Sequence, residues 1–449
     1  TWCGPCVQEM PELAEVAEEY KDRQVVFYAV NQQEESDQIS EFLNKKELDI
    51  TVALDVEGDA ALDYGVEGIP MLVLIDKAGV VQAVHIGYDP KIKSVLRQEL
   101  DDLLAGKNLA EEFKTQRQQE EAAAAKPEGL EPAWSHDGRY STVAVDGQQN
   151  AIFALKSRRQ CEVLNAAGEI QRTFEIERNV TQLRPANLTP SDQTELLGYD
   201  QWGGFVTAVA LDGTRLWTES GGEGIDDVWA ADLDSDGQDE VIVGYNGGTG
   251  LHVFDRTGVR RWQYDRIGNV WHVAAGDVTG DGSIEVVTTS ASGQVHLFDA
   301  DGQQLKELDC SIYANMVRVG RVAEDDDADT IFVVGTGDNN EQLVALDGAG
   351  TELWAVDLPD DTNHCDSMAI ARGTAWAAVG LRGGLVIVVD LLQGTIIARA
   401  VRQGQSPQVN WATDPADDSP LLLVATGRSL DAYHVKPQAP GDTEDEPVE

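Results

Sequence analysis

The apolar residues at the start of the chain recur with a helical period and then give way to a short continuous run. In CVQEMPELAEVAEEYKD the apolar side chains return every three or four residues, which predicts an amphipathic helix. The residues concerned are Met10, Leu13, Val16, Ala17 and Tyr20. The run VVFYAVN at Val25–Asn31 is uninterrupted and predicts a buried strand. A helix followed by a strand is the beginning of an α/β fold.

Four further elements continue this alternation up to about residue 108. SDQISEFLNKKEL begins at Ser36, a residue type favoured at helix N-termini, and predicts a second helix. MLVLID and VVQAVHIG lie on either side of the turn KAG and predict an antiparallel pair of strands. KIKSVLRQELDDLLAG predicts a last amphipathic helix that ends at Gly106. We therefore expect residues 1–108 to form one α/β layer domain.

After residue 108 the pattern becomes almost entirely strand-like. Residues 109–129 are rich in Ala, Gln, Glu and Lys and predict an exposed helical linker. From residue 130 a hairpin recurs, in which an apolar run, an Asp, a turn Gly and a second apolar run follow one another. Its turn glycines are 45, 45, 44, 48 and 44 residues apart and are Gly168, Gly213, Gly258, Gly302, Gly350 and Gly394. Four short strands fit this period, which is typical of β-propeller blades.

The two ends of the repeat region complement each other. The last unit supplies three strands, QVNWATD, PLLLVATG and SLDAYHV, but no fourth. LEPAWSH (Leu130–His136) precedes the first unit and can fill this vacancy. Residues 130–436 therefore predict seven blades, one of them built from both ends of the region, with no free sheet edge. Recurrence at one blade position favours a role as wedges between blades for Trp217, Trp262 and Trp354.

The charge balance excludes one class of partner. The chain carries 79 acidic and 33 basic side chains, a net charge of −46, which repels phosphate backbones. We therefore expect no nucleic-acid partner. Residues 437–449 are also acidic and predict a disordered tail. Five cysteines are too few for a disulfide scaffold in a chain of this length; they are the close pair Cys3 and Cys6 and the scattered Cys161, Cys310 and Cys365.

The opening TWCGPC places two cysteines at the beginning of the first predicted helix. Unpaired N–H groups and the helix dipole stabilise a thiolate there, so Cys3 is the candidate nucleophile. Cys6 lies one turn further in and can attack a mixed disulfide that Cys3 has formed. A zinc site needs more Cys or His ligands than His85, and a haem site needs His in place of Val7. The residues favour a redox pair over a metal site, a haem attachment or coincidence.

Four segments carry a resemblance to a known family: WCGPC, EMPEL, VVFYAVN and YGVEGIPMLVLIDKAGVVQAVHIG. They resemble the thioredoxin superfamily, and within it the TlpA/ResA-type thiol-disulfide oxidoreductases, over roughly residues 1–105. The resemblance implies that Cys3 is the attacking thiol and Cys6 the resolving thiol. The family also places a hydrophobic strand immediately before the Trp-Cys pair, for which Thr1 leaves no room. We therefore expect the chain to be a fragment, with this strand and any export signal or membrane tether upstream of Thr1.

The resemblance also assigns roles outside the cysteine pair. It implies that the bond between Ile69 and Pro70 is cis and that Pro70 packs beside the pair. The backbone of Ile69 can then pair with an extended substrate segment, and Trp2 is a second candidate substrate contact. In VNQQEES, Glu34 is the candidate proton acceptor near Cys6. The alternative for Glu34 is an exposed carboxylate at a helix start.

Two loops of the repeat region carry oxygen ligands at alternate positions, the spacing of a calcium loop. In DLDSDGQDE the candidate ligands are Asp232, Asp234, Asp236, the carbonyl oxygen of Gln238, and Glu240. In DVTGDGSIE, 45 residues later, they are Asp277, Thr279, Asp281, the carbonyl oxygen of Ser283, and Glu285. The loops resemble those of FG-GAP/VCBS propellers, whose blades bind Ca²⁺, and the Trp-terminated hairpins resemble quinoprotein blades. The alternative is an Asp-Gly turn with only a geometric role.

Two functions fit these features. The first is an extracytoplasmic thiol-disulfide oxidoreductase, periplasmic or at the cell surface, that reduces or exchanges protein disulfides and uses the propeller as a docking module. Its redox step needs no cofactor beyond the Cys3–Cys6 pair, and one or two structural Ca²⁺ ions are expected on the propeller. This function requires a protein thiol or disulfide substrate and an electron donor, and the expected ligand of the propeller is a protein or a glycan. The second function is a calcium-stabilised propeller for binding or adhesion with a vestigial thioredoxin-like head.

Overall fold

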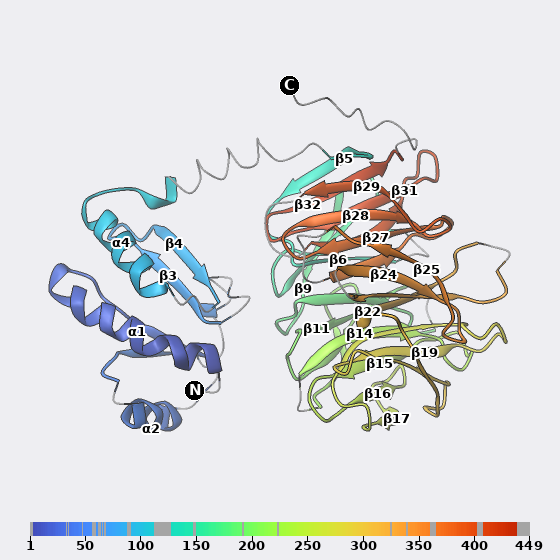
Figure 1. The fold of residues 1–449 in the computed structure, drawn as a ribbon, viewed down its shortest axis with the longest axis horizontal. Helices are drawn as coiled ribbons and strands as arrows, with labels where there is room; N and C mark the ends of the chain where they lie inside the picture. Colours follow the sequence, from blue (N-terminus) through green and yellow to red (C-terminus); the bar gives the residue numbers. More distant parts are fainter. Residues whose placement is uncertain are drawn as a thin grey trace. The chain divides into compact units, whose positions relative to one another are not determined.

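The computed structural model divides into two compact units, residues 1–124 and residues 125–449 (Figure 1). No described helix combines the length and apolar character that a membrane span requires. The described residues are 3–32, 34, 36–46, 48–55, 60–61, 64, 66, 69–87, 91–111, 127–146, 150–190, 193–221, 224–323, 326–337, 340–359, 365–401 and 407–437.

The N-terminal unit contains two small sheets with helices packed against them. Its elements are α1 (Gly4–Tyr20), η1 (Lys21–Arg23), β1 (Ala29–Gln32), α2 (Ser36–Lys46), β2 (Val52–Asp55), β3 (Met71–Ile75), β4 (Val81–Ile86) and α4 (Ile92–Leu104). β1 pairs with β2 in parallel, and β3 pairs with β4 antiparallel. The core lies between α1, α4 and the β3–β4 pair, and its buried side chains include Leu13, Val16, Leu74, Ala83 and Leu96. This is the thioredoxin-like layer arrangement that the sequence predicts.

One predicted element of this unit differs from the structure. The run Val25–Asn31 is predicted to be a buried strand, but β1 has only four residues, and Val26 is 72% exposed. β1 pairs with β2 and β3 pairs with β4, and no described strand lies between β1 and β3. The prediction of burial is wrong because one edge of β1 has no described neighbour that could cover it. The other predicted elements are confirmed, and Gly106 at the end of α4 has the expected left-handed conformation, with φ of +89°.

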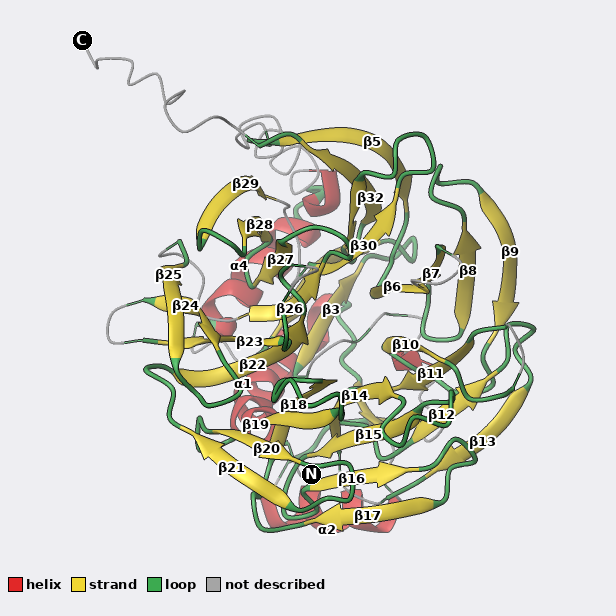
Figure 2. Ribbon diagram, turned by 90° about the vertical axis from the view of Figure 1, so that its right-hand side faces the viewer, coloured by secondary structure: helices red, strands yellow, loops and turns green. Residues whose placement is uncertain are grey.

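The C-terminal unit is a ring of seven four-stranded antiparallel sheets, as predicted (Figure 2). Blades 1 to 6 each contain four consecutive strands, and the first strand of each lies nearest the centre of the ring. The strands of blades 1 to 3 are β6 (Thr142–Asp146), β7 (Ala151–Leu155), β8 (Gln160–Leu164), β9 (Ile170–Glu175), β10 (Gln182–Ala186), β11 (Glu195–Tyr199), β12 (Val206–Val209), β13 (Arg215–Glu219), β14 (Ile225–Ala231), β15 (Glu240–Tyr245), β16 (Leu251–Phe254) and β17 (Arg260–Tyr264). Those of blades 4 to 6 are β18 (Val270–Gly276), β19 (Glu285–Ser290), β20 (Val295–Phe298), β21 (Gln304–Leu308), β22 (Tyr313–Gly320), β23 (Thr330–Thr336), β24 (Glu341–Leu346), β25 (Glu352–Asp357), β26 (Cys365–Ile370), β27 (Trp376–Leu381), β28 (Leu385–Asp390) and β29 (Thr395–Val401).

Blade 7 closes the ring in the predicted way. Its strands are β30 (Gln408–Thr413), β31 (Pro420–Ala425), β32 (Ser429–Val435) and β5 (Leu130–Asp137). β5 comes from the beginning of the unit and pairs antiparallel with β32, with Leu130 opposite Val435. Backbone hydrogen bonds therefore join the two ends of the ring, and β5 supplies the fourth strand that the last repeat unit lacks.

The recurring tryptophans pack between neighbouring blades, as predicted. The indole N–H of Trp217 in blade 2 donates to the carbonyl oxygen of Arg256 in blade 3, at 2.9 Å. A Cβ placed on Gly258, the turn glycine of blade 3, would lie 2.8 Å from this indole, so the turn requires Gly. Trp262 and Trp354 make the same contact with the next blade. Trp134 on β5 repeats it against blade 1, which the sequence reading did not single out.

The start of the propeller lies slightly earlier than expected. Glu128, in the segment expected to be a linker, exchanges two backbone hydrogen bonds with Arg399 on β29, both at 2.8 Å. The Glu128 carboxylate also pairs with the Arg399 guanidinium at 2.7 Å. Residues 112–126 of the expected linker and 438–449 of the expected tail lie outside the described residues.

Candidate functional site

The cysteine pair stands at the N-terminus of α1. Cys3 is the N-cap residue of this helix, and its sulfur accepts a hydrogen bond from the N–H of Cys6 at 3.2 Å. The two cysteines form a disulfide with their Cα atoms 5.3 Å apart, within the normal range for such a bond. A backbone N–H of the first turn thus points at the Cys3 sulfur. The same contact would stabilise a thiolate after reduction.

Ile69 and Pro70 lie beside the pair, and the bond between them is cis, as the resemblance implied. The sulfur of Cys3 is 4.0 Å from the carbonyl oxygen of Ile69. The carbonyl oxygen of Pro70 accepts a hydrogen bond from the N–H of Gly87 at 2.8 Å, which holds the start of β3 against the end of β4. The backbone next to the disulfide is therefore fixed to the sheet.

A cavity of about 600 Å³ adjoins the pair. Both cysteines, Ile69, Pro70 and Glu34 line it, together with apolar side chains of α1, β1 and β3. The Glu34 carboxylate accepts a hydrogen bond from the Asn31 amide at 2.8 Å. The structure thus brings together every predicted residue of this site except Trp2, which lies outside the described residues. An apolar cavity beside a disulfide can receive the side chains of a protein substrate.

Glu9 belongs to the same cavity, and the sequence reading missed it. Its side chain is 2% exposed and lies on α1 three residues after Cys6 and four before Leu13. The signal was available, because this spacing places Glu9 on the buried face of the helix. A buried carboxylate beside Cys6 is a second candidate for the proton acceptor, alongside Glu34.

The remaining cysteines are free and differ from the pair in their surroundings. Cys161 and Cys365 are buried and Cys310 is half-buried. Burial raises the pKa of the Cys161, Cys310 and Cys365 thiols, so each keeps its proton at neutral pH. Protonated thiols are poor nucleophiles, which restricts thiol chemistry in the described residues to Cys3 and Cys6.

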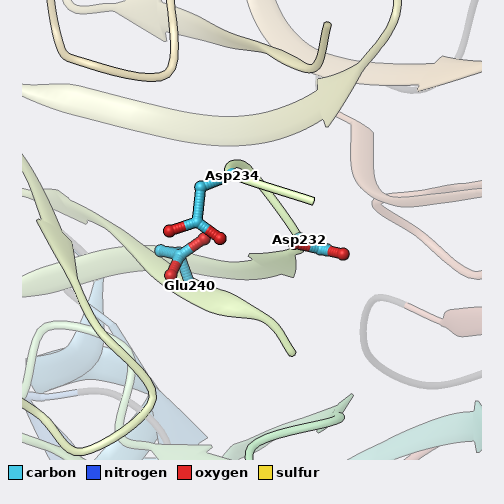
Figure 3. Close-up of side chains that lie close together, drawn as sticks. All are labelled: Asp232, Asp234 and Glu240. Atoms are coloured by element: carbon cyan, nitrogen blue, oxygen red, sulfur yellow. The ribbon is translucent and has the colours of Figure 1, made fainter. Parts of the chain in front are cut away.

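In the first predicted calcium loop, three carboxylates converge. Oxygen atoms of Asp232, Asp234 and Glu240 lie within 4.8 Å of one another (Figure 3). Arg261 contacts two of these groups, at 2.7 Å from Asp234 and 2.8 Å from Glu240. The donor set is all oxygen and fits a hard cation, provided that the guanidinium of Arg261 turns away.

Two predicted ligands of this loop have other contacts. The carboxylate of Asp236 lies outside the converging group and accepts the N–H of Gln238 at 2.8 Å. Both oxygens of Asp232 accept backbone N–H groups, among them that of Gly237 at 2.9 Å. Gly237 has φ of +88°, which permits the sharp bend. These bonds are also the ones that an Asp-Gly turn makes without a metal.

The second predicted loop has similar backbone contacts but no converging group. Asp277 accepts the N–H of Gly282 at 3.0 Å, and Asp281 accepts the N–H of Ser283 at 2.8 Å. Glu285 accepts the N–H and the hydroxyl of Thr279, at 3.2 and 3.3 Å. Among the described residues, three carboxylates come together in the first loop only.

Each nine-residue loop, such as DLDSDGQDE, ends in a glutamate, and this glutamate caps the turn in three consecutive blades. Glu240 accepts the N–H of Leu233 at 3.0 Å, and Glu285 accepts that of Val278 at 3.0 Å. Glu195, one blade before Glu240, makes the same bond to Leu188 at 2.8 Å in a loop that lacks the metal spacing. Burial raises the pKa of Glu240 and Glu285. This position therefore has a structural role that needs no cation.

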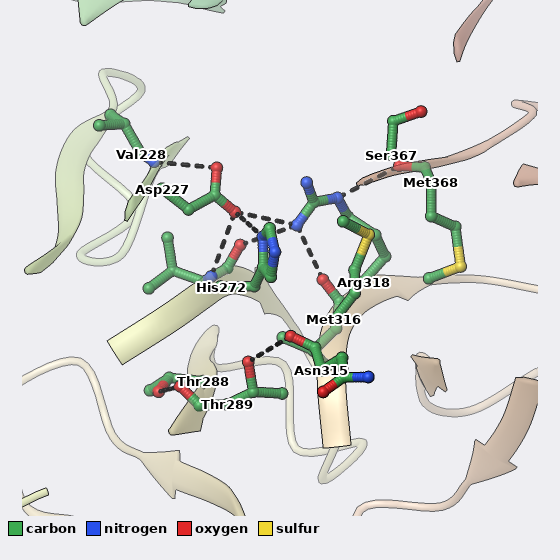
Figure 4. A network of polar contacts seen from close by, with 12 residues as sticks. Asp227, Val228, His272, Thr288, Thr289, Asn315, Met316, Arg318, Ser367 and Met368 are labelled. Atoms are coloured by element: carbon green, nitrogen blue, oxygen red, sulfur yellow. Dashed lines mark hydrogen bonds and ion pairs between the residues drawn. The ribbon is translucent and has the colours of Figure 1, made fainter. Parts of the chain in front are cut away.

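A buried ionic cluster lies at the inner strands, the first strands of the blades (Figure 4). The sequence did not lead us to predict it. The Asp227 carboxylate on β14 contacts Arg184 at 3.3 Å, Arg318 at 3.1 Å and His272 at 3.1 Å, and the Tyr199 hydroxyl donates to it at 3.0 Å. Burial opposes its charge, but the guanidiniums and the His272 hydrogen bond hold the pKa of Asp227 well below its usual range. Its members come from blades 2 to 5 and tie them together. Charged residues that interrupt apolar runs, as in MVRVG and GIDDVWA, were the available signal.

Residues 1–100 of the chain match the Redoxin family. Over 104 residues the chain is 35% identical to the thioredoxin-like protein YneN of Bacillus subtilis, covering 22% of this chain and 59% of YneN. Over 81 residues it is 37% identical to the thiol-disulfide oxidoreductase ResA of Bacillus thuringiensis, covering 18% of this chain and 47% of ResA. The chain thus spans about half the length of these curated relatives.

The propeller has its own matches. Residues 199–270 match the lambda-carrageenase beta-propeller domain family. A solved structure described as BBS1N in complex with ARL6DN, soaked with lead, superposes with a TM-score of 0.51 at 13% identity, covering 70% of this chain and 99% of the other. At this identity the likeness concerns the fold alone.

Proposed function

We propose that the N-terminal unit is a thiol-disulfide oxidoreductase acting on protein disulfides. The observation that carries this proposal is the Cys3–Cys6 disulfide at the N-terminus of α1, beside Ile69 and Pro70 and open to an apolar cavity. The identity with ResA and YneN supports it. No cofactor is required for the step, because the electrons pass between sulfur atoms.

The proposed reaction has two displacement steps. The Cys3 thiolate attacks one sulfur of the substrate disulfide, forms a mixed disulfide and releases the other substrate sulfur as a thiolate. The Cys6 thiolate, formed when a carboxylate takes its proton, attacks the Cys3 sulfur and releases the second substrate thiol. The substrate gains two electrons and the cysteine pair is oxidised to a disulfide. A dithiol donor must then reduce the pair.

Two carboxylates line the cavity and can accept the Cys6 proton. Glu34 is the expected group, and Glu9 is the more deeply buried one. Glu34→Gln and Glu9→Gln should separate them, because loss of the acceptor changes the pH profile of the resolving step, whereas a structural effect lowers the rate equally at every pH.

Insulin reduction by the full chain, with dithiothreitol as donor, tests the activity. Cys3→Ser should lower the rate at least about 100-fold, because the nucleophile is lost. Cys6→Ser should trap a mixed disulfide with the substrate, visible by mass spectrometry. Cys310→Ser, at a protonated free thiol, is the matched control. Equal rates for Cys3→Ser and Cys310→Ser would refute the proposal.

We also propose that the loop from Asp232 to Glu240 binds one Ca²⁺ ion, and that the protein acts outside the cytoplasm, where calcium is abundant. The three converging carboxylates support the first statement. Isothermal titration with CaCl₂ should give binding that Asp232→Asn removes, that Asp277→Asn in the second loop leaves unchanged, and that Arg261→Gln strengthens by freeing two carboxylates. Identical titrations for all four chains would contradict a site in this loop.

The second candidate function is a calcium-dependent binding module with a vestigial head, and the converging carboxylates are the observation that favours it. The two candidates make opposite predictions. If calcium removal abolishes partner binding while alkylation of the cysteines changes nothing, the binding module is the correct description.

A further inference from the structure

The ionic cluster of the inner strands has an uncompensated positive charge. Asp227 supplies one negative charge, whereas Arg184 and Arg318 supply two positive ones. Burial lowers the pKa of His272, so its ring is neutral at pH 7, and burial raises the pKa of the Tyr199 phenol, which is neutral as well. A buried surplus charge is costly unless an opposite charge lies near it.

Arg318 also keeps an unused donor. Its Nε donates to the carbonyl oxygen of Met368 at 3.2 Å, and its Nη1 donates to Asp227 at 3.1 Å and to the carbonyl oxygen of Val317 at 2.8 Å (Figure 4). Within the described part of the chain its Nη2 has no hydrogen-bond partner, although the side chain is only 6% exposed. This N–H donor is not fully enclosed and can therefore donate to an acceptor on a ligand.

Arg318 lines a cavity of about 1100 Å³ at the ends of the inner strands. Arg184 and Trp229 also line it, and both guanidiniums lie over the Trp229 ring, at 5.2 and 5.0 Å from its centroid. Arg321 and Arg372 are more exposed and also line the cavity, and Arg321 is paired with Asp329 at 3.1 Å. Four arginines thus surround one cavity in a chain of net charge −46.

The same cavity offers acceptors for hydroxyl groups. Asp146 and Asp239 line it; Asp146 accepts the hydroxyl of Thr194, and Asp239 accepts the N–H of Asn187 at 2.8 Å. Ionised carboxylates accept hydrogen bonds and repel anions. A ligand that matches the whole cavity therefore carries a negative group on one side and hydroxyl groups on the other, and the volume admits a molecule much larger than a bare ion.

We propose that this cavity binds a small acidic sugar, with the oxyanion of the sugar, a carboxylate or a sulfate, on Nη2 of Arg318. The oxyanion compensates the surplus charge of the cluster, and the more exposed Arg372 adds to the attraction. Charge-assisted bonds between guanidinium and oxyanion are among the strongest hydrogen bonds in proteins. This site is separate from the cysteine pair and does not depend on the function proposed for it.

Calorimetric titration of the full chain with three sugars tests the site. The probes are glucuronate, glucose 6-sulfate and neutral glucose. At least one acidic sugar should bind about ten-fold or more tightly than glucose, and its affinity should fall with added salt. The better of the two acidic probes identifies the oxyanion.

Three substitutions complete the test. Arg318→Lys keeps the charge but moves the donors, and should weaken binding about ten-fold. Arg372→Gln, at an exposed position, should weaken binding about three-fold with the fold intact. Arg256→Gln makes the same charge change at an exposed turn of blade 3 and should have no effect. Tryptophan fluorescence checks that each variant is folded.

Two results would overturn the proposal. One is that neither acidic sugar binds more tightly than glucose. The other is that Arg318→Lys and Arg372→Gln both bind like Arg256→Gln. If Arg318→Lys does not fold, Arg372→Gln alone decides. Prior alkylation of the cysteines should leave all affinities unchanged, which separates this test from the proposed redox function.

Discussion

Tyr28, just before β1 in the N-terminal unit, and Tyr245, on β15 of the propeller, show the same residue type in two contrasting sheets. Tyr28 is 61% exposed, whereas Tyr245 is fully buried. β15 has hydrogen-bonded strands on both sides, β14 and β16, while β1 has only β2 among the described strands. Full burial of an apolar side chain contributes about 1.5–3 kcal/mol. Whether an apolar strand stabilises a fold therefore depends on its neighbours more than on its own sequence.

The two units also place their polar chemistry differently. The N-terminal unit holds its disulfide at a helix end beside an apolar cavity, with backbone groups as the nearest partners. The propeller encloses an ionic cluster whose carboxylate is 2% exposed and has partners from several blades. The first arrangement places both sulfur atoms at a cavity. The second arrangement stabilises the ring and leaves one charge for a ligand.

Removing the Asp227 carboxylate should have the largest effect on stability. Asp227→Ala leaves two guanidiniums buried without a counter-charge, which should cost about 3–5 kcal/mol of the free energy of unfolding of the propeller. Urea unfolding followed by tryptophan fluorescence reports on this unit, since nine of the ten tryptophans, all but Trp2, lie in residues 125–449.

Asp309→Asn is the matched control for this experiment, because Asp309 is exposed and makes no hydrogen bond or ion pair with the residues that the structure describes. It should change the free energy of unfolding by less than about 0.5 kcal/mol. If Asp227→Ala is as mild as Asp309→Asn, the cluster does not hold the blades together, and the contrast between the units is wrong on this point.

The contact between β5 and blade 1, which closes the ring, should contribute as much to stability as the contact between blades 2 and 3. Trp134→Ala removes the indole of β5 from blade 1, and Trp217→Ala removes the equivalent indole between blades 2 and 3. Each should cost about 2 kcal/mol, less than a fully buried Trp because both side chains are partly exposed. A much smaller cost for Trp134→Ala, with the full cost for Trp217→Ala, would mean that β5 does not close the ring in solution.

A smaller effect concerns Asp226, through which the stability of the propeller should depend on pH. Burial raises its pKa to about 6, above the value in the unfolded chain of about 3.9. Between these two values the folded state binds more protons than the unfolded state, so stability falls as the pH rises from about 4 to 6. Asp226→Asn should remove this part of the slope and stabilise the propeller at pH 7.5 by about 1 kcal/mol. Equal slopes for the two chains between pH 4.5 and 7.5 would contradict the assignment.

The sequence predicted the propeller well because its signals are local and repeated. Turn glycines such as Gly258 and wedge residues such as Trp217 recur once per blade, so each copy supports the others. The cysteine pair was found for a similar reason, since both thiols and the helix that positions them lie in one segment. Ile69 and Pro70, more than 60 residues away, needed the family resemblance as well.

The Asp227 cluster could not be predicted in this way. His272 is 45 residues from Asp227 and Arg318 is 91 residues away, and only the closed ring brings them together. The prediction of a buried strand at Val25–Asn31 was wrong for the opposite reason. Its apolar run shows which residues would gain from burial, but a sequence does not show whether a neighbouring strand is present to bury them.

The smallest change in stability is expected for a substitution on the exposed side of β1. This substitution also tests most directly the contrast between β1 and β15. Tyr28→Ser in the 449-residue chain should change the free energy of unfolding of the N-terminal unit by less than about 0.5 kcal/mol, because an exposed side chain loses little on substitution. Leu13→Ala, in the core of the same unit, should cost about 2–5 kcal/mol. Far-UV circular dichroism measures both changes in the free energy of unfolding, once the unfolding of the propeller has been matched between the variants. If Tyr28→Ser costs more than about 1.5 kcal/mol, a segment covers β1 in solution, and the unit is closed like the propeller.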